Sequence, residues 1–95
     1  MALPKFLQSC LASYDLSKMD KKRDKKLIIT EILNKGDDRA IRWLGANYTL
    51  QEIKEVVSSP IRGMWLSETL TYWLKILDLK LPEDVLKRSV LNLSP

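Results

Sequence analysis

The stretch DKKLIITEILNKGD, residues 24–37, decides the fold of this chain. Its apolar side chains recur at the spacing of one helix face, and its lysines fall mostly outside that stripe. The stripe consists of Ile28, Ile29, Ile32 and Leu33. Gly36 follows the last periodic turn, and glycine accepts the left-handed conformation that closes many helices. The pattern predicts an amphipathic helix from about Lys21 to Lys35.

Short helices are predicted on both sides of this stretch. Asp37 and Ser67 are good N-caps, and Thr49 with Glu52 has the spacing of a capping box. Pro82 suits the first turn of a last helix, where its missing N–H costs little. We expect helices over residues 1–15, 21–35, 38–46, 49–58, 67–79 and from 82 onward. The buried face expected for the helix at 49–58 consists of Leu50, Ile53, Val56 and Val57.

Signals of β-structure are missing from the chain. No segment sustains an alternation of apolar and polar residues, and no hairpin turn separates two β-rich runs. With 95 residues, the chain is long enough for one modest core and too short for two. The sequence therefore predicts an all-α fold. We expect one domain over residues 1–95, built as a single small bundle of five or six short helices with helix-turn-helix-like corners.

Composition limits the classes of function. Apolar residues make up 45% of the chain and charged residues 29%, the ordinary balance of a folded protein. No apolar run approaches the roughly 20 residues that cross a bilayer, so we expect a cytoplasmic protein without membrane contact. The chain has no histidine and a single cysteine, Cys10, and so lacks the commonest general base and any cysteine metal cluster. We expect no enzyme, no metal and no cofactor.

The positive charge is concentrated in the first third of the chain. The formal net charge is +4; residues 1–35 hold eight cations and four anions, and residues 36–95 hold eight of each. One interpretation of this charge is a surface that attracts an acidic protein or a nucleic acid. The candidate residues for it are Lys21, Lys22, Arg23, Lys25, Lys26, Arg39 and Arg42. The alternative is a solvated helix face, in which Asp20 and Asp24 provide local partners for the run.

The loop PIRGMW, residues 60–65, combines a cation, a glycine and a large aromatic residue. Trp43 and Trp73 lie on or beside apolar helix faces, so we expect both in the core. Trp65 lies in the loop and is either a plug between helices or an exposed interface anchor, a role in which Trp and Arg are enriched. The candidate partner-binding residues are Arg62, Gly63 and Trp65.

The corner between the helices expected at 38–46 and 49–58 has the spacing of a helix-turn-helix. Its second helix would present Gln51, Glu52, Lys54 and Glu55. Two glutamates near the start of a recognition helix would repel phosphate, so a plain helical corner is favoured. A helix-turn-helix-like DNA-binding transcriptional regulator is the alternative function.

Five blocks of the sequence, in order, resemble a family of short bacterial proteins of unknown function. The blocks are YDLSKMD (14–20), DKKLIITEILNKGD (24–37), RWLGANYTLQEIKEVV (42–57), PIRGMW (60–65) and TLTYWLKIL (69–77). Members of this family are often encoded beside a nucleotidyltransferase-like toxin of the AbiEii type. The resemblance implies an antitoxin or accessory partner of such a toxin, and it carries over no catalytic motif.

Residues and resemblance together predict a non-enzymatic protein-binding module that occludes a nucleotidyltransferase-type toxin. In this hypothesis the loop at 60–65 binds the toxin, and the basic segment 18–26 is attracted to an acidic, metal-binding active site. Nucleic acid is the second choice of partner. The sequence leaves the identity of the partner, the stoichiometry and the oligomeric state open.

Overall fold

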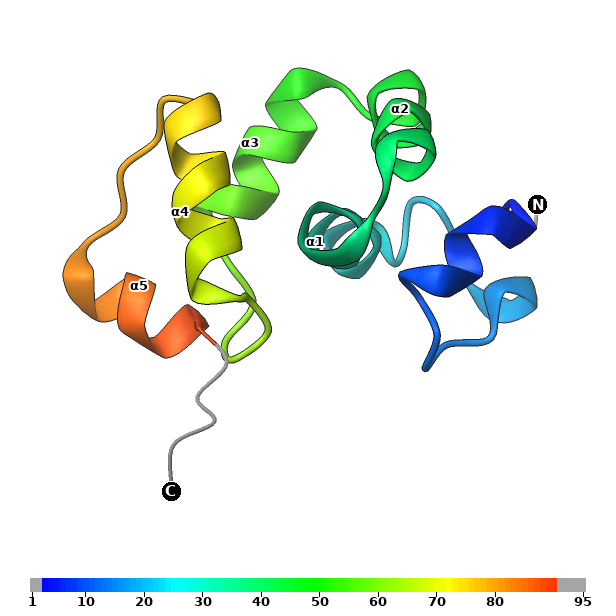
Figure 1. The fold of residues 1–95 in the computed structure, drawn as a ribbon, viewed down its shortest axis with the longest axis horizontal. Helices are drawn as coiled ribbons and strands as arrows, with labels where there is room; N and C mark the ends of the chain where they lie inside the picture. The colour runs from blue at the N-terminus through cyan, green and yellow to red at the C-terminus, as the bar shows by residue number, and fades with distance from the viewer. Residues whose placement is uncertain (1–2, 91–95) are drawn as a thin grey trace.

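The helix α1 (Lys25–Lys35) lies at the centre of the fold (Figure 1). The computed structural model describes residues 3–90. Helix α1 contacts three others: α2 (Asp38–Asn47), α3 (Leu50–Ser58) and α4 (Ser67–Ile76). The last helix is α5 (Glu83–Ser89). In Figure 1 the N-terminal segment lies on one side of α1, and α4 and α5 lie on the other.

The apolar stripe of α1 forms the middle of the hydrophobic core. Ile28, Ile29 and Ile32 are fully buried. Complete burial of a side chain of this size contributes about 1.5–3 kcal/mol by removing apolar surface from water. The same connected cluster includes leucines from other segments of the chain: Leu7, Leu11, Leu44, Leu70 and Leu74. The predicted amphipathic helix is therefore confirmed.

The start of α1 lies four residues later than predicted. The carboxylate of Asp20 accepts hydrogen bonds from the backbone N–H groups of Lys22 and Arg23 at 2.7 and 3.0 Å. These are N-cap contacts to N–H groups that a first turn leaves without partners, and the N–H of Lys25 then bonds only three residues back, to the carbonyl of Lys22 at 3.4 Å. Residues 21–24 therefore form a turn, and the α-helix begins at Lys25.

Gly36 ends α1 for a reason that differs from the prediction. Its φ and ψ angles are −72° and 146°, which is an extended and not a left-handed conformation. A Cβ atom at this position would lie 2.6 Å from the carbonyl oxygen of Ile32. The close approach of the backbone, rather than an unusual dihedral angle, therefore requires glycine here.

Two of the three predicted caps are confirmed. The side chain of Asp37 accepts from the N–H of Ala40 at 3.0 Å, and Thr49 and Glu52 form both hydrogen bonds of a capping box. Ser67 is not a cap, because it is already the first residue of α4. The N–H of the preceding residue, Leu66, donates instead to Asn34 Oδ1 at 3.2 Å.

Within the range of the helix predicted over residues 1–15, the described residues form only a short 3-10 helix, η1 (Lys5–Ser9), and a second one, η2 (Leu16–Lys18), follows that range. Between residues 3 and 90 the structure has five α-helices, and its β-pairing is limited to an isolated bridge between Trp65 and Val90. The predicted all-α bundle is thus confirmed. None of the helices in this range is long and apolar enough to span a bilayer.

Candidate functional site

Trp65 is fully buried, with an exposed fraction of 0%. Of the two interpretations of this residue, the plug between helices is therefore the one that the structure shows. A side chain in this position has no surface to offer a partner, so the assignment of Trp65 as a partner-contacting residue is wrong. Its indole Nε1 is buried without a hydrogen-bond acceptor among residues 3–90.

The loop at residues 60–66 is held by segments that are distant in the sequence. The N–H groups of Gly63 and Trp65 donate to the carbonyl oxygens of Arg88 and Ser89 at 2.9 and 3.0 Å, which ties the loop to the end of α5. On the other side, the amide of Asn34 in α1 donates to the carbonyl of Met64 at 3.0 Å, in addition to accepting from the N–H of Leu66. The loop is therefore a structural junction between α1 and α5.

Arg62 and Gly63 have different roles in this junction. Gly63 has a φ of 71°, in the left-handed region that strains residues with a Cβ, and so its role is conformational. Arg62 is exposed and forms no ion pair within residues 3–90. Of the three candidate loop residues, Arg62 is the one whose side chain is free to contact a partner.

The other two tryptophans pack against the core but are only partly buried. Trp73 Nε1 donates to the carbonyl oxygen of Leu33 at 3.0 Å, which fixes α4 to α1. Trp43 meets the ring of Tyr48 edge to face, with centroids 6.0 Å apart. The prediction that both lie in the core is confirmed only in part, since both pack against it from the edge, and Trp65 in the loop is more deeply buried than either.

The basic run before α1 divides into engaged and available cations. The Arg23 guanidinium pairs with Asp24 at 2.8 Å and donates to the carbonyl of Lys18 at 2.7 Å, so it belongs to the turn. The hydrogen bond from Arg23 lowers the pKa of Asp24 below its ordinary value and keeps it ionised. Lys21 and Lys22 form no ion pair within the described part of the chain.

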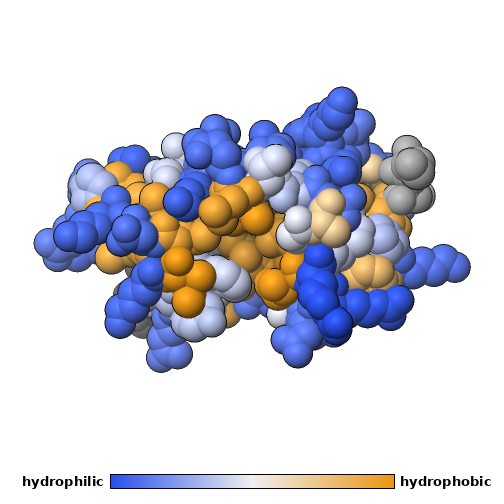
Figure 2. Space-filling model, turned by 90° about the horizontal axis from the view of Figure 1, so that it is seen from above, coloured by the Kyte–Doolittle hydropathy of each residue, from blue (hydrophilic) through white to orange (hydrophobic). Residues whose placement is uncertain are grey.

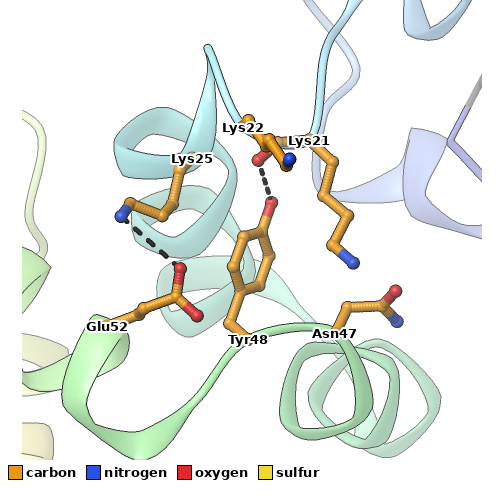
Figure 3. A pocket seen from close by; sticks show the side chains of 6 residues that line it. All are labelled: Lys21, Lys22, Lys25, Asn47, Tyr48 and Glu52. Carbon is orange, nitrogen blue, oxygen red and sulfur yellow. Dashed lines mark hydrogen bonds and ion pairs between the residues drawn. The ribbon is translucent and has the colours of Figure 1, made fainter.

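A pocket of about 410 Å³ brings three of these lysines together with the corner between α2 and α3 (Figure 3). We call it the basic pocket; its lining consists of Lys21, Lys22, Lys25, Asn47, Tyr48 and Glu52. Lys25 Nζ lies 3.5 Å from Glu52 Oε2 on one side of the Tyr48 ring, and Lys21 lies on the other side (Figure 3). The sequence predicted the lysines, but gave no signal that the α2–α3 corner would meet them.

Lys26, Arg39 and Arg42 do not line this pocket. The Arg39 guanidinium lies over the ring of Phe6, 4.1 Å from its centroid, and ties α2 to η1. Arg42 Nε makes a long contact of 3.4 Å with the carbonyl oxygen of Asp38 in its own helix. The predicted basic set is therefore spread over separate parts of the surface.

Three large apolar side chains on α3 and α4 are more than half exposed: Leu50 at 60%, Tyr72 at 57% and Ile76 at 58%. We call these three residues the apolar surface. The neighbouring helices α3 and α4 run in opposite directions, so Leu50 and Ile76 lie at the same end of the pair (Figure 1). Figure 2 looks onto this end and shows apolar side chains gathered over it, bordered by hydrophilic ones. The prediction that Leu50 is buried is therefore wrong.

The described residues contain no group of three or more His, Cys, Asp or Glu side chains placed to hold a metal ion. Cys10 is buried in the core, where its Sγ donates to the carbonyl of Leu7 at 3.3 Å. Burial raises the pKa of the Cys10 thiol above its ordinary value, which favours the neutral form. Neither observation adds a reactive group to the surface.

No curated protein and no solved structure matches this chain. A family model does match it, over residues 6–57, from η1 to the end of α3. The matched segment includes all residues of the basic pocket and stops before the loop at 60–66. Because the match covers more than half of the chain, this protein belongs to that family, which is described as a family of unknown function, DUF6922.

Proposed function

We propose that this chain is a non-enzymatic protein-binding module that acts as the antitoxin or accessory partner of a nucleotidyltransferase-type toxin. The observation that carries the proposal is the apolar surface, three large side chains left more than half exposed on two neighbouring helices. Exposed apolar groups bordered by polar ones are typical of protein–protein interaction sites. Burial of such anchors supplies most of the binding energy of an interface.

Charge near the apolar surface supports an acidic partner. Leu50 lies on the first turn of α3, between two residues of the basic pocket, Tyr48 and Glu52. Lys21 and Lys22, which form no ion pair within the described residues, thus line a pocket with residues that flank Leu50 in the sequence. A nucleotidyltransferase binds its catalytic metal ions with carboxylates, so its active-site entrance would attract these ammonium groups and speed association. In this proposal the bound module occludes that entrance.

The alternative function, DNA reading by a helix-turn-helix, has less support. The exposed side chains of α3 include Leu50, Gln51 and Glu55, and the amide of Gln51 donates to the Glu55 carboxylate at 3.3 Å. A recognition helix needs donors that are free to meet base edges and phosphates. An exposed leucine and an occupied glutamine fit a protein surface better.

The test is co-purification with the product of the neighbouring gene, which this proposal expects to be a nucleotidyltransferase-type protein. We expect the wild-type module to retain that protein, and the double variant L50S/I76S to retain it about tenfold less or worse. Leu66→Ser is the matched control, because Leu66 is 44% exposed but precedes the opposite end of α4. Arg62→Ala measures any contribution of the loop.

Three outcomes would count against the proposal or against its assigned interface. Absence of binding by the wild-type module would reject the assigned function. Equal binding by wild type and by a folded L50S/I76S variant would reject the apolar surface as the interface. A loss of binding in the Leu66→Ser control of the same size would show that the effect is not local.

A further inference from the structure

The basic pocket has a lining that suits a small anion. Its volume is about 410 Å³, and its lining holds three lysines and one carboxylate, with an amide and a phenol completing the wall (Figure 3). Pockets of this size are large enough for a small-molecule group. The lining has three ammonium groups and one carboxylate, so it carries a net positive charge.

The single carboxylate of the lining is already occupied. Glu52 Oε1 accepts from the N–H of Thr49 at 2.9 Å, and Oε2 lies 3.5 Å from Lys25 Nζ. The hydrogen bond from Thr49 lowers the pKa of Glu52 below its ordinary value, so it is ionised and held in the capping box. Glu52 therefore compensates Lys25 and leaves Lys21 and Lys22 without a counter-charge.

The two nearby aspartates are also directed elsewhere. Asp20 accepts from the backbone N–H groups of Lys22 and Arg23, and Asp24 accepts from the N–H of Asp20 at 2.8 Å and pairs with Arg23. These bonds hold the turn that carries Lys21 and Lys22. The aspartates thus fix the backbone and do not pair with the two lysines.

The rest of the pocket is held rigidly. Tyr48 is 5% exposed, and its hydroxyl donates to the carbonyl oxygen of Lys21 at 2.8 Å, which ties the turn to the α2–α3 corner. Lys21 Nζ lies 5.8 Å from the centroid of the same ring. Asn47 Nδ2 donates to the carbonyl of Trp43 at 2.8 Å, so this side chain is also fixed. The wall behind the two lysines therefore does not have to be ordered when a ligand binds.

We propose that the basic pocket binds a phosphate group. Lysine is a point-charge donor to phosphate, and its ammonium forms charge-assisted hydrogen bonds with phosphate oxygens. Lys21 and Lys22 are the primary ligands, and Lys25 joins them beside its ion pair with Glu52. The phosphate comes either from a free ion or nucleotide, or from the backbone of a nucleic-acid strand. This inference does not depend on the proposed toxin partner.

The test uses the chain alone, titrated with inorganic phosphate and followed by the backbone amide resonances. We expect saturable shifts confined to residues 20–25 and 47–52, which a chloride titration at matched ionic strength does not reproduce. The double variant K21A/K22A should bind phosphate about tenfold more weakly or worse. Both substitutions keep the carbonyl that Tyr48 binds, so the pocket wall stays in place.

Lys26→Ala is the matched control, because Lys26 is exposed, close in sequence and outside the lining. It should leave phosphate affinity unchanged within about twofold. A parallel titration with a short single-stranded oligonucleotide distinguishes the sources of phosphate. Tighter binding than inorganic phosphate, with a steep loss in salt, identifies a nucleic-acid strand, whereas no gain over inorganic phosphate identifies a free ion or nucleotide.

The proposal is overturned if neither phosphate nor oligonucleotide produces saturable shifts at the pocket. It is also overturned if Lys26→Ala weakens binding as much as K21A/K22A, since the attraction would then be diffuse and not located in the pocket. Both results come from the chain alone, without a toxin. A failure of the phosphate proposal is therefore distinguishable from a failure of the toxin proposal, which is tested by co-purification.

Discussion

Substitutions of the buried Trp65 can separate the contribution of packing to stability from that of hydrogen bonding. Trp65 is the largest fully buried side chain, and its Nε1 has no acceptor among residues 3–90. The substitution Trp65→Ala leaves a cavity in the core and should cost about 3–5 kcal/mol. A chain of this length has a total free energy of unfolding of about 5–14 kcal/mol, so this variant loses a large share of it.

The substitution Trp65→Phe addresses the indole N–H. Phenylalanine keeps most of the apolar contact and removes a buried donor whose unpaired state costs about 1–3 kcal/mol. The two effects oppose each other, and we expect a net cost of about 1 kcal/mol. Trp73→Phe is the comparison, because it loses the 3.0 Å hydrogen bond to the carbonyl of Leu33. Trp65→Phe should cost no more than Trp73→Phe, although Trp65 is the more deeply buried residue.

Urea unfolding followed by far-UV circular dichroism measures these differences. With a slope of about 1–2 kcal/mol per molar urea, Trp65→Ala should lower the midpoint by about 1.5 M or more, and Trp65→Phe by about 1 M or less. Arg62→Ala, in the same loop but exposed, should stay within about 0.5 kcal/mol of wild type. The reasoning is refuted if Trp65→Phe costs as much as Trp65→Ala, or if Trp65→Ala is as stable as wild type.

Three further predictions concern other parts of the fold. Asn34→Ala removes both hydrogen bonds from α1 to the loop around Trp65 and should cost about 1–3 kcal/mol in urea unfolding; an unchanged midpoint would show that the bonds are dispensable. Gly45 lies within α2 with open space around it, so Gly45→Ala should stabilise the fold by up to about 1 kcal/mol. Gly36→Ala should destabilise the fold by about 1–3 kcal/mol, because the new Cβ would meet the Ile32 carbonyl. Melting temperatures that shift in the same direction for both variants would contradict this prediction. Burial is the larger cause and nearby carboxylates the smaller one of a rise in the pKa of Tyr48 from 10.0 to about 12. As the pH rises, the unfolded chain therefore loses the phenol proton before the folded chain does. The free energy of unfolding should fall between these two pH values. Tyr48→Phe should flatten that fall, and equal slopes in the two proteins would argue against it.

Local patterns in the sequence were sufficient for the five α-helices, but not for the segment before them, where the helix expected over residues 1–15 is absent from the described residues. The 3.6-residue period of the apolar side chains and the caps Asp37 and Thr49 depend only on residues within a few positions of one another. Even so, the start of α1 was misplaced, because residues 21–24 form a turn capped by Asp20 in which the N–H of Lys25 bonds three residues back. Element type was therefore predictable, and element boundaries were less so.

The environment of Trp65 could not be predicted in the same way. Its loop is held by Asn34, Arg88 and Ser89, which lie more than twenty residues away along the chain. The sequence shows the unusual composition of the loop but not these contacts. A buried tryptophan and an interface tryptophan consequently have the same local signature, and the contacts decide between them.

For the candidate surfaces too, the sequence predicted local features but not the contacts between distant segments. Lys21, Lys22 and Lys25 were predicted as a basic cluster, whereas Tyr48 reaches them only through the packing of the α2–α3 corner. Leu50 has the helical spacing of a core residue but is the first residue of α3, where it lies beyond the edge of the core. Periodicity gives the face of a helix, and tertiary packing decides how far along that face the core extends.

The function proposed above is that this module occludes a nucleotidyltransferase-type toxin through the apolar surface. Its most direct test is nucleotide transfer by the purified toxin in the presence of increasing amounts of the module. We predict stoichiometric inhibition by the wild-type module and by Leu66→Ser, and about tenfold weaker inhibition or less by L50S/I76S. Full toxin activity in the presence of excess wild-type module, or equal inhibition by the folded L50S/I76S variant, would contradict the claim.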